Sequence, residues 1–427
     1  MAQHTILALV HNNATMQQRN DTYSQPAAIS SGASLSSLPP ATAAGNHSFI
    51  RAKGRLQVFA PQGIYAVPMK HIRGCEMAQW SHERKRSEQT LFSTSEWNSL
   101  GDELRSGKGS IHDGTSIPCN ETDRMRLSDA DMNRIINVST IAFAILVRDA
   151  VGFLARNLRI TMTLGEAFRR YWIFYTENDS VDGSKRILSE LTQRHPQIFR
   201  GELRDKVAAN TSTGMCKGSD RNCFKRIDFL ANLRQRVFDM AMAHGGWDAL
   251  VMLDLDFLQV SSHHFWQAVA IGVRLRAAAV FGQSVQRNLK GHCLLYDTGA
   301  YVYNWRTDMS KKAMTIRNPV LKKMNKGCVG LVQSGHGGFP ILYAGGLAAA
   351  NPKPRYAGHN WSAWGSRVVD LVPFNVMLAR ATMNISLPLH ERRPLFAYSR
   401  FRPLYTWGES GTEDGNYDAA LWWKERR

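Results

Sequence analysis

Residues 247–257 read WDALVMLDLDF, in which the apolar run ALVML is followed by two aspartates separated by one leucine. A short apolar run of this kind is typical of a strand that is buried on both faces. Residues i and i+2 of a strand point to the same side, so we expect Asp254 and Asp256 to project together and Leu255 to turn into the core. Two adjacent carboxylates repel each other unless a cation lies beside them. The stretch therefore predicts a Mn2+ or Mg2+ site, with Asp256 as the main ligand and Asp254 as a supporting contact.

The sequence before this stretch alternates between the periods of strands and helices. Polar clusters follow the three expected strands, and ligands of parallel sheets bind at such carboxyl ends. The order strand, helix, strand, helix, strand predicts an α/β fold with a central, mostly parallel sheet flanked by helices. The expected strands are 140–147, 171–175 and 249–253, and the expected helices are 151–170, 182–195 and the segment FKRIDFLANLRQRVFDMAMAHG, which Gly245 and Gly246 end.

Two of these polar clusters carry further candidate contacts. Arg148 could donate two hydrogen bonds to a diphosphate, or it could pair with acidic groups around Asp149. Glu177, Asp179 and Asp182 follow the second strand, where they could contact a nucleoside. A helix cap is an equally open interpretation for Asp182, and a turn acceptor for Asp179.

Composition and charge restrict the partners. The chain has 427 residues, a formal net charge of +18 and 44% hydrophobic residues, which indicates a globular protein with polyanionic partners or simply basic solvated faces. Because neither a basic-aromatic RNA-binding pattern nor zinc-finger spacing occurs, we expect no nucleic-acid partner. We predict four segments: a disordered stem or linker at 1–50, a partly ordered region at 51–135, a catalytic domain at 136–395 and a basic aromatic tail at 396–427.

Two features bear on the cell compartment. Asn-x-Ser/Thr occurs more often than chance predicts, which favours the Golgi or another secretory-pathway lumen. We identify no apolar run long enough to span a bilayer, so membrane association is expected only through an anchor absent from this sequence. Cys216 and Cys223 could close a disulfide or remain free. The glycosylation motifs begin at Asn13, Asn20, Asn46, Asn120, Asn137, Asn178, Asn210, Asn360 and Asn384.

The blocks IAFAILVRDA, YWIFYTENDSVDGSKRILSEL, RIDFLANLRQRVFDMA and WDALVMLDLDF resemble GT-A glycosyltransferases of the fungal capsular α-1,3-mannosyltransferase type, glycosyltransferase family 69 and its relatives. The resemblance covers roughly residues 136–390. It implies a GT-A type nucleotide-diphospho-sugar transferase fold. It also implies metal-dependent transfer of a hexosyl group, mannosyl from GDP-mannose, to a glycan hydroxyl with retention of configuration.

The resemblance also assigns roles to residues. Asp254 and Asp256 would serve the metal, and Glu177, Asp179 and Asp182 would contact base and ribose. Arg148 and Arg234 would meet the diphosphate, although Arg236 competes with Arg234 for that role. In VQSGHGGFPILY, Gly337 and Gly338 would let the backbone approach a sugar, unless they form a plain turn. Asp370, in DLVPFNVMLA, would be a general base, although a retaining enzyme needs none; His359 and His390 are candidate third metal ligands.

Other classes of function remain open from the sequence. Asp-x-Asp also occurs on strands of nucleotidyltransferases of the polymerase-β type, which place a Gly-Ser pair before it, whereas His244-Gly245-Gly246-Trp247 precedes it here. A non-catalytic glycan-binding or nucleic-acid-binding protein is the remaining alternative. Such a protein would keep its activity after the loss of both aspartates.

Overall fold

The computed structural model describes residues 93–106, 117–118, 126–205, 221–287, 293–295, 327–357 and 370–405. All of these residues belong to one compact unit, Val58–Arg427. The expected stem, the expected Cys216–Cys223 pair, His359 and the chain after residue 405 lie outside the described side chains. Within the described part, no helix is long and apolar enough to cross a membrane.

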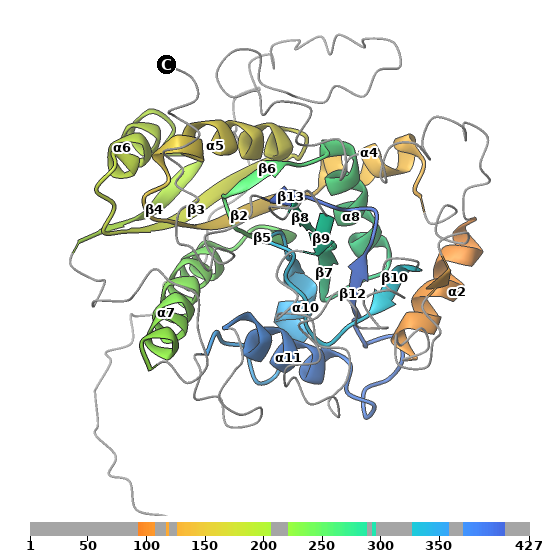
Figure 1. Cartoon of the computed structure of the whole chain (residues 1–427). Helices are drawn as coiled ribbons and strands as arrows, with labels where there is room; N and C mark the ends of the chain where they lie inside the picture. Colours follow the sequence, from red (N-terminus) through yellow and green to blue (C-terminus); the bar gives the residue numbers. More distant parts are fainter. Residues whose placement is uncertain are drawn as a thin grey trace, which may run out of the picture. The chain divides into compact units, whose positions relative to one another are not determined.

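A nine-stranded sheet forms the centre, in the order β1-β10-β12-β7-β11-β5-β2-β3-β4 (Figure 1). The pairings give seven strands one direction, whereas β10 and β11 run the other way. The predicted α/β fold with a mostly parallel central sheet flanked by helices is therefore confirmed. The strands are β1 Ile117–Pro118, β10 Gly327–Leu331, β12 Leu395–Tyr398, β7 Ala279–Gly282, β11 Ile341–Tyr343, β5 Ala249–Leu253, β2 Thr140–Val147, β3 Arg170–Asn178 and β4 Phe199–Arg204.

The two faces of the sheet are built by alternate residues of β2. Ile141, Phe143 and Ile145 join one apolar core, whereas Ala142 and Ala144 join the other. Small side chains on the second face leave room for a helix to pack closely against it. The three strands expected from the sequence are confirmed. Strand β4 was not expected, because FRGELR lacks an apolar run and lies at the sheet edge with alternating exposure.

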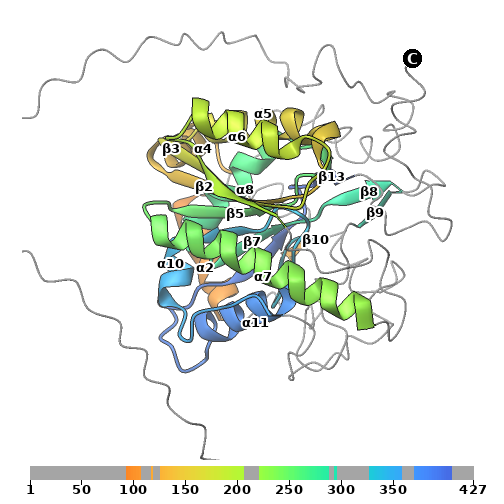
Figure 2. The ribbon, with the colours of Figure 1, turned by 90° about the vertical axis from the view of Figure 1, so that its left-hand side faces the viewer.

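Helices cover both faces, as Figure 2 shows with the sheet lying between α5 and α6 above and α7 and α11 below. The first core is closed by α2 Thr94–Arg105, α4 Asp129–Val138, α5 Val151–Glu166, α6 Ser184–Arg194 and α8 Ser262–Arg274. The second is closed by α7 Arg221–His244, α10 Ala344–Ala349 and α11 Leu371–Thr382. A serine side chain caps the first turn of α2, α4 and α8. Gly245 and Gly246, both with positive φ, follow the end of α7 as expected.

A second sheet has four strands, and side chains of two of them are buried in the first apolar core. It comprises β6 Phe257–Gln259, β13 Leu404–Tyr405, β8 Val285–Arg287 and β9 Cys293–Leu295, in that order. Trp97 of α2 and Tyr405 of β13 are buried in the same core as the strands between them. The core thus extends on both sides of the range 136–395, because apolar side chains outside that range complete it.

Candidate functional site

The strand order reverses between β2 and β5, whose carboxyl ends lie side by side. Strands β3 and β4 lie on one side of β2, whereas β5 pairs with its other side. At such a topological switch point the loops diverge, and ligands of open α/β sheets bind there. Arg148 follows β2 and Asp254 follows β5, so two of the expected site residues flank this point.

Asp254, Leu255 and Asp256 form a turn between β5 and β6 and do not continue the strand. The expectation that the strand pleat aligns the two aspartates is therefore wrong, because β5 ends at Leu253. Leu255 is buried as expected, whereas Asp254 and Asp256 are half-buried. Asn157 of α5 fixes the turn by donating from its amide to the carbonyl oxygens of Leu255 and, at 2.8 Å, Phe257.

An ion-pair network holds the Asp254 carboxylate from two sides. Arg234 of α7 contacts Asp254 Oδ1 with Nη2 at 3.3 Å and Asp370 Oδ2 with Nη1. His336 Nε2 lies 2.7 Å from Asp254 Oδ2. Burial alone would raise the pKa of Asp254, but the charge and hydrogen bond of His336 and those of Arg234 hold it well below its usual value. Three segments far apart in sequence thus meet at this carboxylate.

The network shows which of the two candidate arginines faces the aspartate turn, and the expected contact of Arg234 with a diphosphate stays a prediction. Arg234 has a side chain only 12% exposed and bridges two carboxylates. Arg236 instead points to the opposite side of α7, where it forms an exposed pair with Glu202 of β4 at 2.9 Å. Because two residues along a helix turn the side chain by about 200°, only Arg234 can face Asp254.

His336 was missed by the sequence analysis, and His390 was considered in its place. His336 is buried in the glycine-rich segment that had been considered only for its glycines. His390 is exposed, pairs with Glu391 at 3.7 Å and precedes β12. Because β12 and β5 run in the same direction, His390 lies on the side of the sheet where these strands begin, whereas Asp254 lies where they end. The candidate role of His390 as a metal ligand is therefore wrong.

Gly337 and Gly338 lie beneath the aspartate turn. Both are buried, both have positive φ, and Gly338 O accepts a hydrogen bond of 2.9 Å from Asp254 N. The hydroxyl of Tyr405 covers Gly338 and also donates to Asp254 O at 3.3 Å. The two glycines therefore support the aspartate turn, and their expected contact with a sugar stays a prediction.

Replacing Gly338 by alanine tests this support. The new Cβ would lie 1.9 Å from the Tyr405 hydroxyl at a φ of +68°, so we expect a loss of unfolding free energy of at least about 3 kcal/mol. Gly246→Ala is the matched control, because its φ is +72° but no atom lies within 4 Å of the new Cβ. Urea unfolding of both variants separates backbone strain from overpacking. Equal losses would contradict a packing role for Gly338.

The loops after β2 and β3 are joined by acidic and hydroxyl side chains. Asp149 Oδ1 accepts from Val181 N, and Asp149 N donates to Ser180 Oγ, both at 2.9 Å. Glu177, fully buried, accepts from Ser180 N at 2.8 Å. Asp149 and Asp179 both adopt left-handed backbone conformations, which aspartate tolerates better than most residues. These contacts give Glu177 a structural role; the expected substrate contacts of Glu177 and Asp179 remain predictions.

Asp182 accepts from the first backbone N–H of two helices: α6, as the cap interpretation has it, and also α5. Its Oδ2 accepts from Val151 N at 2.7 Å, which caps α5, whereas Gly183 is the N-cap residue of α6. Its Oδ1 accepts from Ser184 N and Oγ. Burial would raise the pKa of Asp182, but these hydrogen bonds outweigh the effect of burial, so the pKa lies below its usual value.

We expect Asp182→Ala to lower the unfolding free energy by about 1 kcal/mol, the usual cost of losing a cap. Because the folded pKa is depressed, the contribution of Asp182 is present above its unfolded pKa and is lost as pH falls through the folded value. Thermal unfolding at neutral pH and near pH 3 measures both effects. Asp182→Asn keeps an acceptor and should retain part of the stability at either pH.

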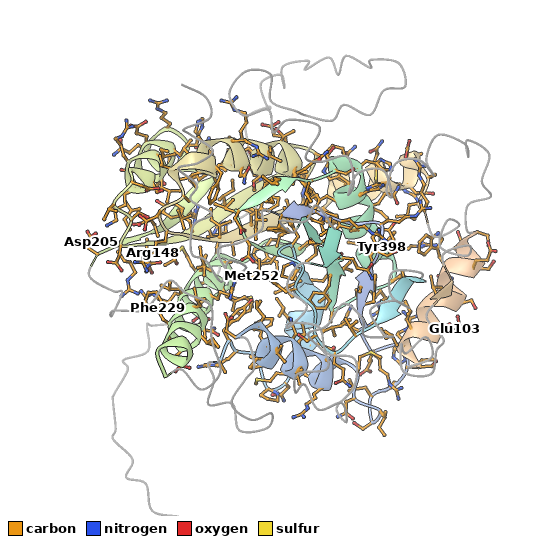
Figure 3. All side chains as sticks on the ribbon, in the orientation of Figure 1. Glu103, Arg148, Asp205, Phe229, Met252 and Tyr398 are labelled. Atoms are coloured by element: carbon orange, nitrogen blue, oxygen red, sulfur yellow. The ribbon has the colours of Figure 1, made fainter. Side chains whose placement is uncertain are left out.

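Arg148 directly follows β2 at this switch point. Its side chain is 38% exposed and lies 3.6 Å from Asp149 in a surface pair, which contributes little to stability. Figure 3 shows Arg148 and Asp205, which follow β2 and β4, on the same side of the molecule. Arg148 can therefore turn toward an anionic ligand at little cost.

Asp370 differs from its expected role. Its side chain is 5% exposed and bonded to Arg234, and it precedes the first residue of α11. A general base must contact the substrate hydroxyl, whereas this carboxylate is buried and bonded to Arg234. The geometry thus favours a structural role for Asp370 and leaves its expected role as a general base without support.

The protein residues present could hold a metal ion only if a bound ligand supplied further donor atoms. Among the described side chains, no group of three or more His, Cys, Asp or Glu residues could hold a metal. Asp254 is engaged by Arg234 and His336, and Asp256, half-buried in the same turn, is the second carboxylate that would hold the metal. One or two carboxylates completed by phosphate oxygens and water is a common arrangement for Mg2+. His336 Nδ1 and Asn178 Nδ2, both buried, have no hydrogen-bond partner within the described ranges, which suits a site that takes polar ligands.

No protein-family model and no curated protein matches the chain. Similar solved structures include GalNAc-T7 with UDP, GalNAc and Mn2+ (11% identity, 64% of this chain, 44% of that chain, TM-score 0.38). Others are S. aureus TarS 1–349 with UDP-GlcNAc (9%, 62%, 58%, 0.33) and the mannosyltransferase PcManGT from Pyrobaculum calidifontis with GDP-Man and Mn2+ (9%, 73%, 68%, 0.35). The chain spans less than two thirds of the first two.

Proposed function

We propose that this protein is a metal-dependent glycosyltransferase of the GT-A type that uses a sugar nucleotide as donor. The observation that carries the proposal is the turn of Asp254 and Asp256 at the switch point, with Asp254 held by Arg234 and His336. This arrangement immobilises the Asp254 carboxylate in a turn that also carries Asp256, which is half-buried. Such preorganisation is what a site that stabilises developing charge requires.

The residues divide the work as follows. Asp256 would hold a Mn2+ or Mg2+ ion, which supplies neutralisation of charge on the departing diphosphate. Arg148 would donate to the same diphosphate from the opposite side of the switch point. Arg234 and His336 act through Asp254, whose position they fix. Asp149, Glu177 and Asp182 keep the two loops on the nucleotide side in place.

The finer features follow the family resemblance. We propose that the donor carries a hexosyl group, with GDP-mannose as the first candidate. The acceptor is a glycan hydroxyl, and the reaction retains the configuration of the sugar. In a retaining reaction the leaving phosphate can accept the proton of the acceptor hydroxyl, so no side-chain base is needed. The burial of Asp370 against Arg234 supports this assignment. The Golgi or another secretory lumen remains the proposed compartment.

The test is hydrolysis and binding of a panel of sugar nucleotides, including GDP-mannose, UDP-N-acetylglucosamine and UDP-glucose. We expect one donor to be hydrolysed with Mn2+ and its hydrolysis to stop when EDTA removes the metal. Binding of nucleoside triphosphates with incorporation into a polynucleotide would instead favour a nucleotidyltransferase. If no sugar nucleotide is bound or hydrolysed, the proposal fails.

A further inference from the structure

Asn375, a buried polar residue of α11, bonds to the segment that carries His336. Asn375 is 3% exposed, and its Nδ2 donates to Gly335 O at 2.7 Å and to Ser334 Oγ at 3.2 Å. Ser334 is fully buried as well. Because an amide buried without partners is costly, these two bonds fix how α11 meets the residues directly before His336.

The backbone on both sides of His336 is held by other elements of the core. Gly335 lies against the ring of Phe281 in β7, because a Cβ at position 335 would lie 2.7 Å from that ring. On the other side, Ser284 Oγ donates to Gly337 O. The bonds from Asn375 therefore act on a short segment that packs closely against the sheet and carries the histidine.

The imidazole of His336 depends on this segment for its orientation. Its Nε2 lies 2.7 Å from Asp254 Oδ2, whereas its Nδ1 is buried and has no hydrogen-bond partner among the described residues. Histidines at metal sites usually have their second ring nitrogen fixed by an outer hydrogen bond. Since the described residues supply no such bond, the backbone around His336 has to set where the ring lies.

Helix α11 contacts both partners of Asp254. Asp370, the residue before its first turn, bonds to Arg234. Asn375 bonds to the residues before His336. Figure 2 shows α11 on the same side of the sheet as α7, which carries Arg234. The two side chains that hold the Asp254 carboxylate are thus each braced from the same helix.

We propose that Asn375 is a positioning residue of the metal site, which acts by holding His336 against Asp254. Loss of its amide would release the backbone before His336 and weaken the contact with the Asp254 carboxylate. A less firmly held donor set binds a metal ion more weakly. The effect on the metal rests on the proposed function, whereas the placement of His336 by Asn375 does not.

The first test is the affinity of the full chain for Mn2+, measured alone and with GDP or UDP by electron paramagnetic resonance. Asn375→Leu has a similar size and no donor, and we expect it to weaken Mn2+ binding about tenfold, as the loss of outer contacts does. Asn375→Gln keeps an amide and should recover part of the affinity. Thr382→Val is the matched control, because this buried hydroxyl of α11 donates to Leu378 O at 2.9 Å, within the helix. It should bind Mn2+ as the wild type does.

A double variant separates action through His336 from a general structural role. His336→Gln should weaken Mn2+ binding at least as much as Asn375→Leu does. If Asn375 acts through His336, the double variant should bind no more weakly than His336→Gln alone, since one interaction cannot be lost twice. Two losses that multiply in the double variant would overturn the proposal.

The position of His336 can also be followed without a metal. In protein labelled with 15N-histidine, the ring signals of His336 are those that disappear from the magnetic resonance spectrum of His336→Gln. We expect Asn375→Leu to shift them and Thr382→Val to leave them in place. If Asn375→Leu does not fold, Ser334→Ala replaces it and should shift the same signals, because it removes the longer of the two bonds.

The outcomes distinguish this proposal from the proposed function. Unmoved His336 signals in the folded variant would overturn the placement of His336 by Asn375. Shifted signals with unchanged Mn2+ affinity would overturn the role of Asn375 at the metal site. If the wild type binds neither Mn2+ nor a sugar nucleotide, the proposed function fails and the role at the metal site fails with it. The spectrum then still decides whether Asn375 places His336.

Discussion

Asp256→Ala is expected to lower the rate of sugar-nucleotide turnover roughly a thousandfold, because several kcal/mol of charge stabilisation at the leaving group would be lost. The substitution should lower the unfolding temperature less than Asp254→Ala does, because Asn157 and the partners of Asp254 hold the turn. Initial rates at saturating Mn2+ and thermal unfolding measure the two quantities.

Two further variants make that result specific. Asp129→Ala removes an exposed carboxylate of α4, with an exposed fraction of 66%, and should leave the rate unchanged. Asp254→Ala should lose both activity and stability, because it leaves Arg234 and His336 without their shared partner. A loss of stability in Asp256→Ala equal to that in Asp254→Ala would contradict the division of roles between the two aspartates.

Arg234→Ala is expected to lower the unfolding free energy by about 3–5 kcal/mol, the cost of removing one partner from a buried ion pair. The reason is that Asp254 and Asp370 would remain close together without the guanidinium between them. Arg236→Ala, two residues further along α7, removes an exposed pair and should cost no more than about 1 kcal/mol. Urea unfolding at neutral pH compares the two variants.

The same variant has a predicted pH dependence. The pKa of Asp254 is depressed in the folded protein, so its contribution to stability is present above its unfolded pKa, near 4, and is lost as pH falls through the folded value. Removing Arg234 raises that folded pKa, and acid unfolding should therefore begin at a higher pH than in the wild type. Arg234→Lys keeps the charge without the two-pronged geometry and should fall between them. Identical acid unfolding of all three would contradict the network.

The apolar pattern was sufficient to predict the centre of the fold. The strand at 140–147, the strand at 171–175, which the structure extends to Asn178, and the helix that ends at His244 were expected from local sequence. Burial of both faces gives the two strands continuous apolar runs. Strand β4 and the antiparallel β11 escaped prediction. Their short segments carry no distinct period, and only pairing with neighbours makes them strands.

The sequence predicted where the site lies along the chain, but not which residues contact one another there. That Asp254 follows a buried strand could be read from eleven consecutive letters, WDALVMLDLDF. The sequence could not show that His336 rather than His390 lies beside Asp254. The two histidines differ only in the end of the strand to which their segments are joined. The same limit applies to Asp182: a cap of its own helix was an open interpretation, whereas its second bond, to the first turn of α5, could not be read from the sequence.

The sequence by itself determined the apolar strands, the order of strand and helix, and the acidic turn that follows β5, because each depends on neighbouring residues along the chain. Only the tertiary structure decided what holds that turn. Arg234, His336, Tyr405 and Asn157 come from four different elements, and their meeting at one carboxylate and its backbone follows from how the sheet is ordered and covered. Contacts between residues a hundred positions apart leave no local pattern, so they become visible only once the chain is folded.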